Sequence, residues 1–369
     1  MKNQKSKLIF IAPLPPPYGG MSAITKSFFE AGLAEEIDLI HLNTSKNSLT
    51  EKFGKITLHD ILLAIKNYIK LFIICLTNIS NRNAFLIGTS DSGIIRDMGY
   101  IIILKLFKKN IFLNLHGTRT YLRSNELYKF FTRQSIRLSK KILSPTIVDM
   151  KGLSTLNLGG DKNVLFYNST YTNNQFVELS LKQNEEVFTI VGSGRLSKSK
   201  GSFDLINVVC ELLRENYKIK LFWIGRGAFQ EDDRNADEII HLMEKEGFNN
   251  SFYILRDFPD KEKIKVLTNS DIFILPTYSD NLPIAILEAM SLGLPVISTN
   301  IGAIPEVIQK NVNGFLFNAG DVKELKRLII NSIENSDLLI KISCNNKETF
   351  VSKYSSKQRI IELKEFLLN

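Results

Sequence analysis

The feature of this 369-residue chain that most constrains its fold is an alternation of short apolar runs with helical patterns, which occurs twice. In the first half, the apolar runs are separated by segments whose apolar residues recur at helical spacing. The runs that we expect to be strands are 7–12, 38–42, 84–88, 110–115 and 141–144, and the expected helices are 22–33, 57–79, 92–107 and 123–139. Strands that alternate with helices predict a parallel sheet covered on both faces.

A polar segment, NSTYTNNQ at 168–175, then lacks apolar periodicity and is typical of a linker. Beyond it the alternation restarts, with expected strands 187–191, 219–224, 252–255, 272–275 and 295–298 and expected helices 202–215, 237–245, 261–269, 283–291 and 357–368. We therefore expect two doubly wound α/β domains, 1–170 and 171–354, with a C-terminal helix over about 355–369 that packs back on the first. Such sheets bind ligands at the carboxyl ends of their strands, so two facing domains predict a site in the cleft between them.

Composition agrees with a two-domain cytoplasmic protein. A hydrophobic content of 44% is enough for two cores. Cys75, Cys210 and Cys344 lie too far apart for a zinc motif, and nothing in their spacing indicates a disulfide framework. The apolar run near the N-terminus, Leu8–Ala12, is short for a signal peptide, and no stretch reaches the roughly 18–20 apolar residues of a membrane-spanning helix.

Charge is distributed unevenly between the halves. Residues 1–175 hold 23 Lys and Arg against 11 Asp and Glu, whereas 176–369 hold 24 against 27. A basic first half is typical of a protein that faces an anionic partner, such as lipid headgroups, a phosphorylated acceptor or nucleic acid. The general abundance of Lys, Asn and Ile in this sequence is an alternative explanation and stays open.

Each half opens with a strand and a glycine-containing loop. In the first, Gly19 and Gly20 precede a helix and allow backbone amides to approach an oxygen-rich ligand, although such a pair is also ordinary turn chemistry. In the second, Gly194 precedes Arg195, and Lys200 follows on the same Gly/Ser-rich loop. A forked guanidinium and a compact ammonium suit a pyrophosphate, and a solvated basic loop is the alternative.

The most specific motif is a pair of carboxylates, Asp280 and Glu288, at a strand–loop–helix junction with seven residues between them. Amides around Asn281, Leu282 and Ile284 form the electropositive start of the helix, which can bind sugar hydroxyls or phosphate oxygens. Glu288 lies among apolar neighbours, where an unpaired charge is costly, so a ribose diol is the partner that we expect for it.

Taken together, these motifs resemble family 4 of the glycosyltransferases, of the type that builds bacterial surface polysaccharides. The resemblance implies the GT-B fold of two Rossmann-like domains and retaining transfer from a nucleotide-diphosphate sugar. It assigns the two acidic signature positions to Asp280 and Glu288, the diphosphate-binding pair to Arg195 and Lys200, and the first-domain loop to Gly19–Gly20. The segment SLGLPVISTNIGAIPEVIQKNVNGFLF is similar to the run that follows the signature in that family.

Two positions depart from the family pattern. The first acidic position is usually Glu and is Asp280 here, one methylene shorter, so its contact with the donor sugar is expected to differ. Pro283 removes one amide from the loop. Neither change removes a charge, so the expected activity stands.

His116 follows the expected strand 110–115, at its carboxyl end. The resemblance implies that His116 contacts the donor sugar and that its backbone carbonyl stabilises developing positive charge, while a structural role is the alternative. The chain contains no Asp-x-Asp, the usual carboxylate clamp for a metal–diphosphate complex. We therefore expect no metal and no cofactor, with Arg195, Lys200 and a helix dipole neutralising the leaving group.

The expected substrates are a hexose or N-acetylhexosamine donor, with UDP as the expected nucleotide, and a glycan or lipid-linked acceptor. Residues 57–79 and the basic stretch 119–141 suit contact with an anionic membrane, and the alternative is that these helices only cover the sheet. Nucleic acid is not expected, because aromatic stacking motifs are not evident. The remaining alternatives are a nucleotide-sugar epimerase or phosphorylase of the same shape, and a non-catalytic scaffold; the absence of GxGxxG argues against an NAD-dependent dehydrogenase.

Overall fold

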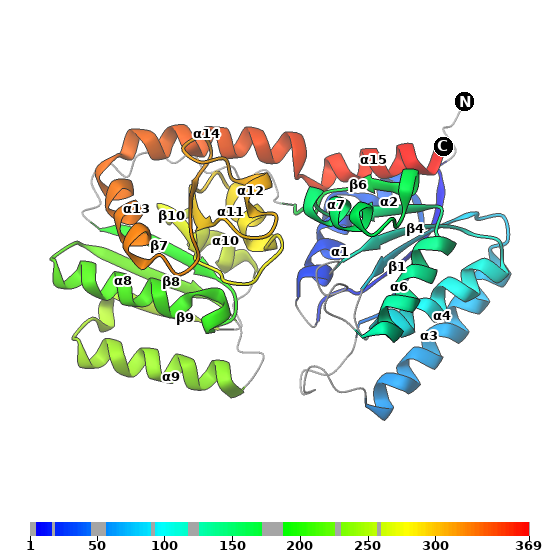
Figure 1. Cartoon of the computed structure of the whole chain (residues 1–369), viewed down its shortest axis with the longest axis horizontal. Coiled ribbons are helices and arrows are strands. Elements are labelled where there is room, and N and C mark those ends of the chain that lie inside the picture. The colour runs from blue at the N-terminus through cyan, green and yellow to red at the C-terminus, as the bar shows by residue number, and fades with distance from the viewer. Residues whose placement is uncertain are drawn as a thin grey trace. The chain divides into compact units, whose positions relative to one another are not determined.

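The computed structural model describes residues 5–16, 19–45, 57–89, 93–116, 125–171, 187–225, 230–256 and 260–368. The chain divides into two compact units (Figure 1). The first comprises Met1–Tyr171 together with Tyr354–Asn369, and the second comprises Thr172–Lys353. Of the segments named above, 172–175 of the polar linker and the basic residues Arg119 and Arg123 lie outside the described residues.

The first unit contains a six-stranded parallel sheet with the order β2-β1-β3-β4-β5-β6. Its strands are β1 Lys7–Ala12, β2 Asp38–Asn43, β3 Asn83–Gly88, β4 Asn110–Leu115, β5 Lys141–Ser144 and β6 Asn163–Leu165. Its helices are α1 Gly20–Glu30, α2 Leu33–Glu36, α3 Leu58–Thr77, α4 Gly93–Leu106, α6 Glu126–Leu138, α7 Ile147–Thr155 and α15 Ser356–Leu368.

Alternate residues of the central strands build two different cores, one on each face of this sheet. Ile9 and Ile11 of β1 join a buried aliphatic cluster that includes Leu71 of α3 and Leu104 of α4. Phe10, between them in sequence, faces an aromatic cluster and packs against rings from α1 and β3. This period of two is what a strand buried on both faces requires.

The last helix of the chain, α15, completes the first unit. Ser356 at its start forms a buried hydrogen bond with Ser27 of α1, with 2.8 Å between the two hydroxyl oxygens, and donates another to Ser169. Near its other end, the Leu367 carbonyl accepts a hydrogen bond from the Asn83 side chain at the start of β3. Helix α15 therefore contacts elements of the first unit at both of its ends.

The second unit contains another six-stranded parallel sheet, with the order β12-β11-β10-β7-β8-β9. Its strands are β7 Phe188–Ser193, β8 Ile219–Ile224, β9 Phe252–Leu255, β10 Ile272–Leu275, β11 Val296–Thr299 and β12 Phe315–Phe317. Its helices are α8 Ser202–Arg214, α9 Gln230–Lys245, α10 Asp260–Thr268, α11 Ile284–Ser291, α12 Ile304–Val307, α13 Val322–Glu334 and α14 Ser336–Lys353. Two doubly wound parallel sheets are what the repeated alternation predicted.

Candidate functional site

The glycine-containing loop after β7 is held in place by close backbone contacts. Gly194 has a φ of +143°, a conformation that residues with a Cβ rarely adopt. Its carbonyl accepts a 2.8 Å hydrogen bond from the indole Nε1 of buried Trp223 in β8. At the end of the loop, a Cβ on Gly201 would lie 2.0 Å from the Pro276 carbonyl oxygen. The loop therefore packs directly on the segment that follows β10.

This packing brings Lys200 and Asp280 together. Lys200 Nζ lies 2.6 Å from Asp280 Oδ1 and 2.7 Å from Oδ2. The two side chains are only 18% and 17% exposed. Thr277 Oγ1 lies 2.7 Å from Asp280 Oδ2 and 3.0 Å from the Ser199 carbonyl oxygen, so its hydroxyl proton has two acceptors. The carboxyl ends of neighbouring strands β7 and β10 thus place a cation and a carboxylate at one point, with Arg195 exposed on the same loop.

Helix α11 begins at Ile284, one residue later than expected, with Pro283 as its N-cap. No side chain caps this end of the helix. The preceding turn is fixed from the other side, because the Ala303 amide donates to the Asn281 carbonyl at 2.8 Å, while Leu282 is buried. An uncapped helix start carries amides that an oxygen-rich ligand can satisfy.

Glu288 has a protein partner that the sequence did not reveal. Its Oε2 lies 2.6 Å from Nζ of Lys263 on α10, and the side chains are 23% and 22% exposed. The sequence analysis named only a ribose diol as a partner for Glu288, and the structure adds a lysine 25 residues earlier that supplies a compensating charge within the protein. The ion pair uses Oε2, and Oε1 is the second acceptor atom of the same carboxylate.

His116 lies in the first unit, directly after β4, where its amide donates to the Gly88 carbonyl. Its Nε2 is 2.8 Å from Oδ1 of Asn114, whose amide nitrogen donates to the Leu143 carbonyl. Since Nδ2 of Asn114 is used as a donor, Oδ1 must accept, which places the ring proton on Nε2 and leaves Nδ1 as the acceptor nitrogen. Burial lowers the pKa of His116 to about 4, so the ring is neutral near pH 7.

Gly19 and Gly20, also in the first unit, lie at the start of α1 and are exposed. Gly19 is the N-cap with an extended backbone, and its amide donates to Ser22 Oγ at 2.9 Å. A Cβ on Gly20 would have nothing within 4 Å, and one on Gly19 would meet only Ser22 Oγ at 4.0 Å. The fold itself does not require glycine at either position, and the space beside this helix start is open.

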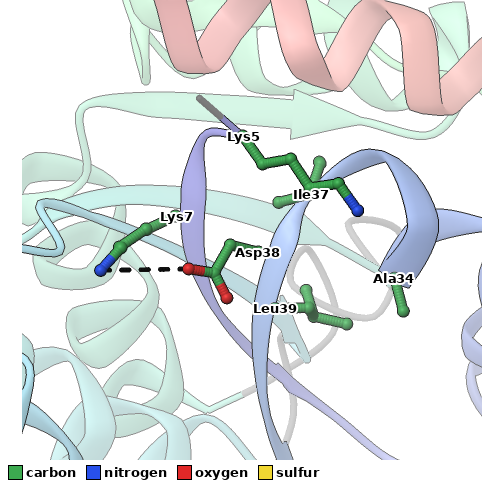
Figure 2. A pocket seen from close by; sticks show the side chains of 6 residues that line it. All are labelled: Lys5, Lys7, Ala34, Ile37, Asp38 and Leu39. Atoms are coloured by element: carbon green, nitrogen blue, oxygen red, sulfur yellow. Dashed lines mark ion pairs between the residues drawn. The ribbon is translucent and has the colours of Figure 1, made fainter. Parts of the chain in front are cut away.

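A hollow of about 430 Å³ lies at the amino ends of strands β1 and β2 in the first sheet (Figure 2). Lys7 and Asp38, which form a 3.9 Å ion pair across it, are the first residues of β1 and β2. Ligands of doubly wound sheets bind at the carboxyl ends of the strands, so this hollow lies at the wrong end to be the predicted site.

Within the described residues, no group of three or more His, Cys, Asp or Glu side chains is arranged to hold a metal ion. Two of the Lys–carboxylate pairs of the second unit involve residues predicted for the site: Lys200 with Asp280 and Lys263 with Glu288. Thr277, Trp223 and Lys263 were not among the residues predicted for the site. Thr277 stands three residues before Asp280, a spacing that could have pointed to it, whereas nothing in the sequence links Lys263 to Glu288.

Comparison with known proteins finds a family model that matches most of the second unit. Residues 173–349 match the model described as "Glycosyl transferases group 1". The capsular polysaccharide biosynthesis glycosyltransferase CapM of Staphylococcus aureus is 26% identical over 220 residues, which cover 60% of this chain and 56% of that protein. The UDP-Gal:alpha-D-GlcNAc-diphosphoundecaprenol alpha-1,3-galactosyltransferase of Escherichia coli is 26% identical over 201 residues, 52% of this chain and 47% of that protein. The chain thus spans about half the length of these two curated relatives.

Solved structures extend the likeness in fold to the whole chain. A glycosyltransferase from Rickettsia africae aligns over 99% of both chains with a TM-score of 0.73 and 16% identity. HepE of Anabaena, solved in complex with UDP, aligns over 98% of this chain and 99% of its own with a TM-score of 0.71 and 14% identity. With the two observed sheets, these neighbours confirm the predicted fold of two Rossmann-like domains.

Proposed function

We propose that this chain, whose residues 173–349 match the Glycosyl transferases group 1 model, is a retaining, metal-independent glycosyltransferase of surface-polysaccharide synthesis. Its donor is a nucleotide-diphosphate hexose or N-acetylhexosamine, with UDP as the nucleotide. Its acceptor is a glycan or a lipid-linked saccharide. The names of the relatives support the polysaccharide assignment, because they include capsular and colanic acid glycosyltransferases.

The observation that carries this proposal is the pair formed by Lys200 and Asp280 at the carboxyl edge of the second sheet. A diphosphate with two or three negative charges competes well with a single carboxylate for the ammonium group. The Lys200 cation can then bind the diphosphate, and Asp280 is left beside it to accept hydrogen bonds from the hydroxyls of the donor sugar. Arg195, exposed on the same loop, adds a second cation for the phosphates.

Glu288 takes the ribose in this proposal. Lys263 holds Oε2 and so fixes the direction of the carboxylate, and Oε1 accepts a hydrogen bond from a ribose hydroxyl. A fixed acceptor loses little side-chain entropy when the nucleotide binds. The start of α11, which no side chain caps, supplies amides for the phosphate or sugar oxygens.

The reaction that we propose is a front-face displacement. The bond between the anomeric carbon and the β-phosphate oxygen breaks, and a bond from the acceptor hydroxyl oxygen forms on the same face. The hydroxyl proton passes to the departing phosphate, so the products are a glycoside and a nucleoside diphosphate. Lys200 and Arg195 stabilise the charge that develops on the phosphate, which is the largest contribution expected from the protein. His116, with a neutral ring and an acceptor Nδ1, is assigned to the donor sugar.

Three measurements on the purified chain test this function. Thermal shift with UDP, GDP and ADP should show stabilisation by UDP, amounting to about 2.7 kcal/mol at a hundredfold excess over Kd. NMR of the product should show the anomeric configuration of the donor, and EDTA should leave the rate unchanged. An inverted product would exclude the retaining mechanism. Conversion of the sugar while it stays on the nucleotide would indicate an epimerase, and no binding of any nucleotide would indicate a scaffold.

A further inference from the structure

Helix α3, Leu58–Thr77, exposes an apolar stripe along its whole length. Six side chains repeat along this stripe at intervals of three or four residues and are between 46% and 73% exposed: Leu58, Leu62, Ile65, Ile69, Phe72 and Leu76. Intervals of three and four residues place side chains on one face of a helix. Exposed single hydrophobic residues are ordinary, but a continuous row over 20 residues marks an interaction surface.

The opposite face of α3 is firmly packed, so the stripe is not a sign of a loosely attached helix. Leu71 and Cys75 are fully buried in the aliphatic core. Tyr68 donates a 3.0 Å hydrogen bond to the Arg96 carbonyl of α4, and a Cβ on Gly99 would lie 2.5 Å from the Tyr68 ring. The structure therefore holds α3 in place while presenting its apolar stripe outward.

The apolar surface continues onto the neighbouring helix. Helix α4 lies between α3 and α6 (Figure 1), and Phe72 of α3 meets Phe107 just beyond the end of α4, with 5.2 Å between the ring centroids. Ile102 and Leu106 of α4 are 50% and 69% exposed. The surface is thus a broad face and not the narrow seam of a coiled coil.

Cations border the stripe. Lys66 and Lys70 are exposed and lie on the side of α3 away from α4 on helical geometry. Neither forms an ion pair with any residue that the structure describes. A second copy of the chain docked on this stripe by twofold symmetry would bring like charges toward each other. An anionic lipid surface complements both features, since the apolar side chains enter the acyl boundary while the lysines meet the headgroups.

We propose that the α3 surface, defined by the stripe residues above together with Lys66 and Lys70, docks the protein on an anionic lipid bilayer. Within the described residues no helix is long and apolar enough to span a membrane. The contact that we propose is peripheral. Docking depends on neither the donor nor the acceptor, and it therefore goes beyond the proposed function. It would place the first unit beside any acceptor carried by a lipid.

The test is flotation of the full chain with vesicles of phosphatidylcholine mixed with phosphatidylglycerol, and with vesicles of phosphatidylcholine alone. We expect binding to the anionic vesicles that weakens at high salt. Ile65→Ser/Ile69→Ser should lose binding at least tenfold while its thermal midpoint stays unchanged, because both side chains are exposed. The matched control is Ile361→Ser/Leu368→Ser on α15, which also removes two exposed apolar side chains.

A second pair of variants tests the charge. Lys66→Glu/Lys70→Glu should weaken binding at least tenfold, because each lysine near an anionic surface contributes roughly a fivefold gain in affinity. Lys341→Glu/Lys353→Glu, which reverses two exposed lysines of α14, is the control and should bind like the wild type. The proposal would be overturned if both α3 variants bound vesicles as tightly as the wild type. It would also be overturned if the wild type were a dimer that did not bind vesicles and the Ile65→Ser/Ile69→Ser variant were a monomer. The assay contains no nucleotide sugar, so its failure leaves the proposed reaction untouched.

Discussion

Lys200 has two proposed roles, which are to stabilise the fold through its ion pair with Asp280 and to bind the diphosphate of the donor. Replacing Lys200 by Met allows these roles to be measured separately. The ammonium lies 2.6 and 2.7 Å from the two carboxylate oxygens, and both side chains are less than one-fifth exposed. Exposed ion pairs contribute about 0–1 kcal/mol, whereas breaking a buried pair costs about 3–5 kcal/mol. For this partly exposed pair we expect Lys200→Met to lower the free energy of unfolding by about 1–2 kcal/mol. That corresponds to a fall in thermal midpoint of roughly 2–8 °C for a unit of this size.

The same change should lower the rate of sugar transfer by roughly a hundredfold to a thousandfold, the effect of removing one group that stabilises leaving-group charge. The double variant Lys200→Met/Asp280→Asn removes the uncompensated carboxylate as well. We expect it to regain most of the lost thermal midpoint without regaining the rate. Differential scanning calorimetry and an assay of released nucleoside diphosphate, run on the two single variants and the double, complete the cycle.

A matched control comes from an ion pair away from this edge of the sheet. Lys326 on α13 lies 2.6 Å from Glu215, the residue that follows α8. Lys326→Met/Glu215→Gln should leave both the midpoint and the rate close to those of the wild type. If the Lys200→Met/Asp280→Asn double variant recovered transfer together with stability, Lys200 would be only a structural partner of Asp280 and the proposed chemistry would fail.

Three further predictions concern other parts of the molecule. Burial lowers the pKa of His116 in the folded chain to about 4, whereas its ordinary value is 6.5, so the unfolded chain binds the proton first as pH falls. Between pH 7 and pH 5 this group should therefore lower the free energy of unfolding by about 1–2 kcal/mol. Urea midpoints measured across this pH range check it, and an equal pH dependence for the wild type and His116→Gln would contradict it. Gly19→Ala/Gly20→Ala should leave the urea midpoint nearly unchanged, because the added Cβ atoms meet open space. The same methyl groups would occupy the space proposed for the donor, so calorimetric titration should show weaker donor binding. Binding as tight as that of the wild type would show that these glycines are not part of the site. Trp223 is the only tryptophan of the chain and donates a hydrogen bond to the Gly194 carbonyl. UDP should therefore change the tryptophan fluorescence, with a half-maximal effect at the same UDP concentration as its thermal stabilisation. Unchanged fluorescence at saturating UDP would show that the nucleotide does not reach this loop.

Much of the architecture could be predicted from the sequence because the strands are short, apolar and regularly spaced. Strands β6 and β12 escaped prediction because each has only three residues, too few to show a period. Helix α13 also went unpredicted, although the sequence carries a signal for it. Leu325, Leu328 and Ile329 recur at helical spacing after Asp321, whose side chain caps the helix.

The site was less predictable, because its contacts join residues far apart in the chain. Asp280 and Lys200 were each assigned to the donor from local sequence, yet their mutual contact spans 80 positions and depends on β7 and β10 being neighbours. Lys263 is an ordinary lysine of a polar helix, and only the tertiary packing brings it to Glu288. Local patterns indicate which residues carry charge at strand ends, whereas the order of strands in the sheet decides which charges meet.

The return of α15 to the first unit has a consequence for biosynthesis. The second unit is one continuous segment, whereas the first is assembled from the beginning of the chain and its last 16 residues. During translation the second unit is therefore complete before the ribosome has released the helix that supplies Ser356 and Phe366 to its neighbours. The half synthesised first is thus finished last, because the ring contact between Phe166 and Phe366 can form only after residues 354–369 have been made.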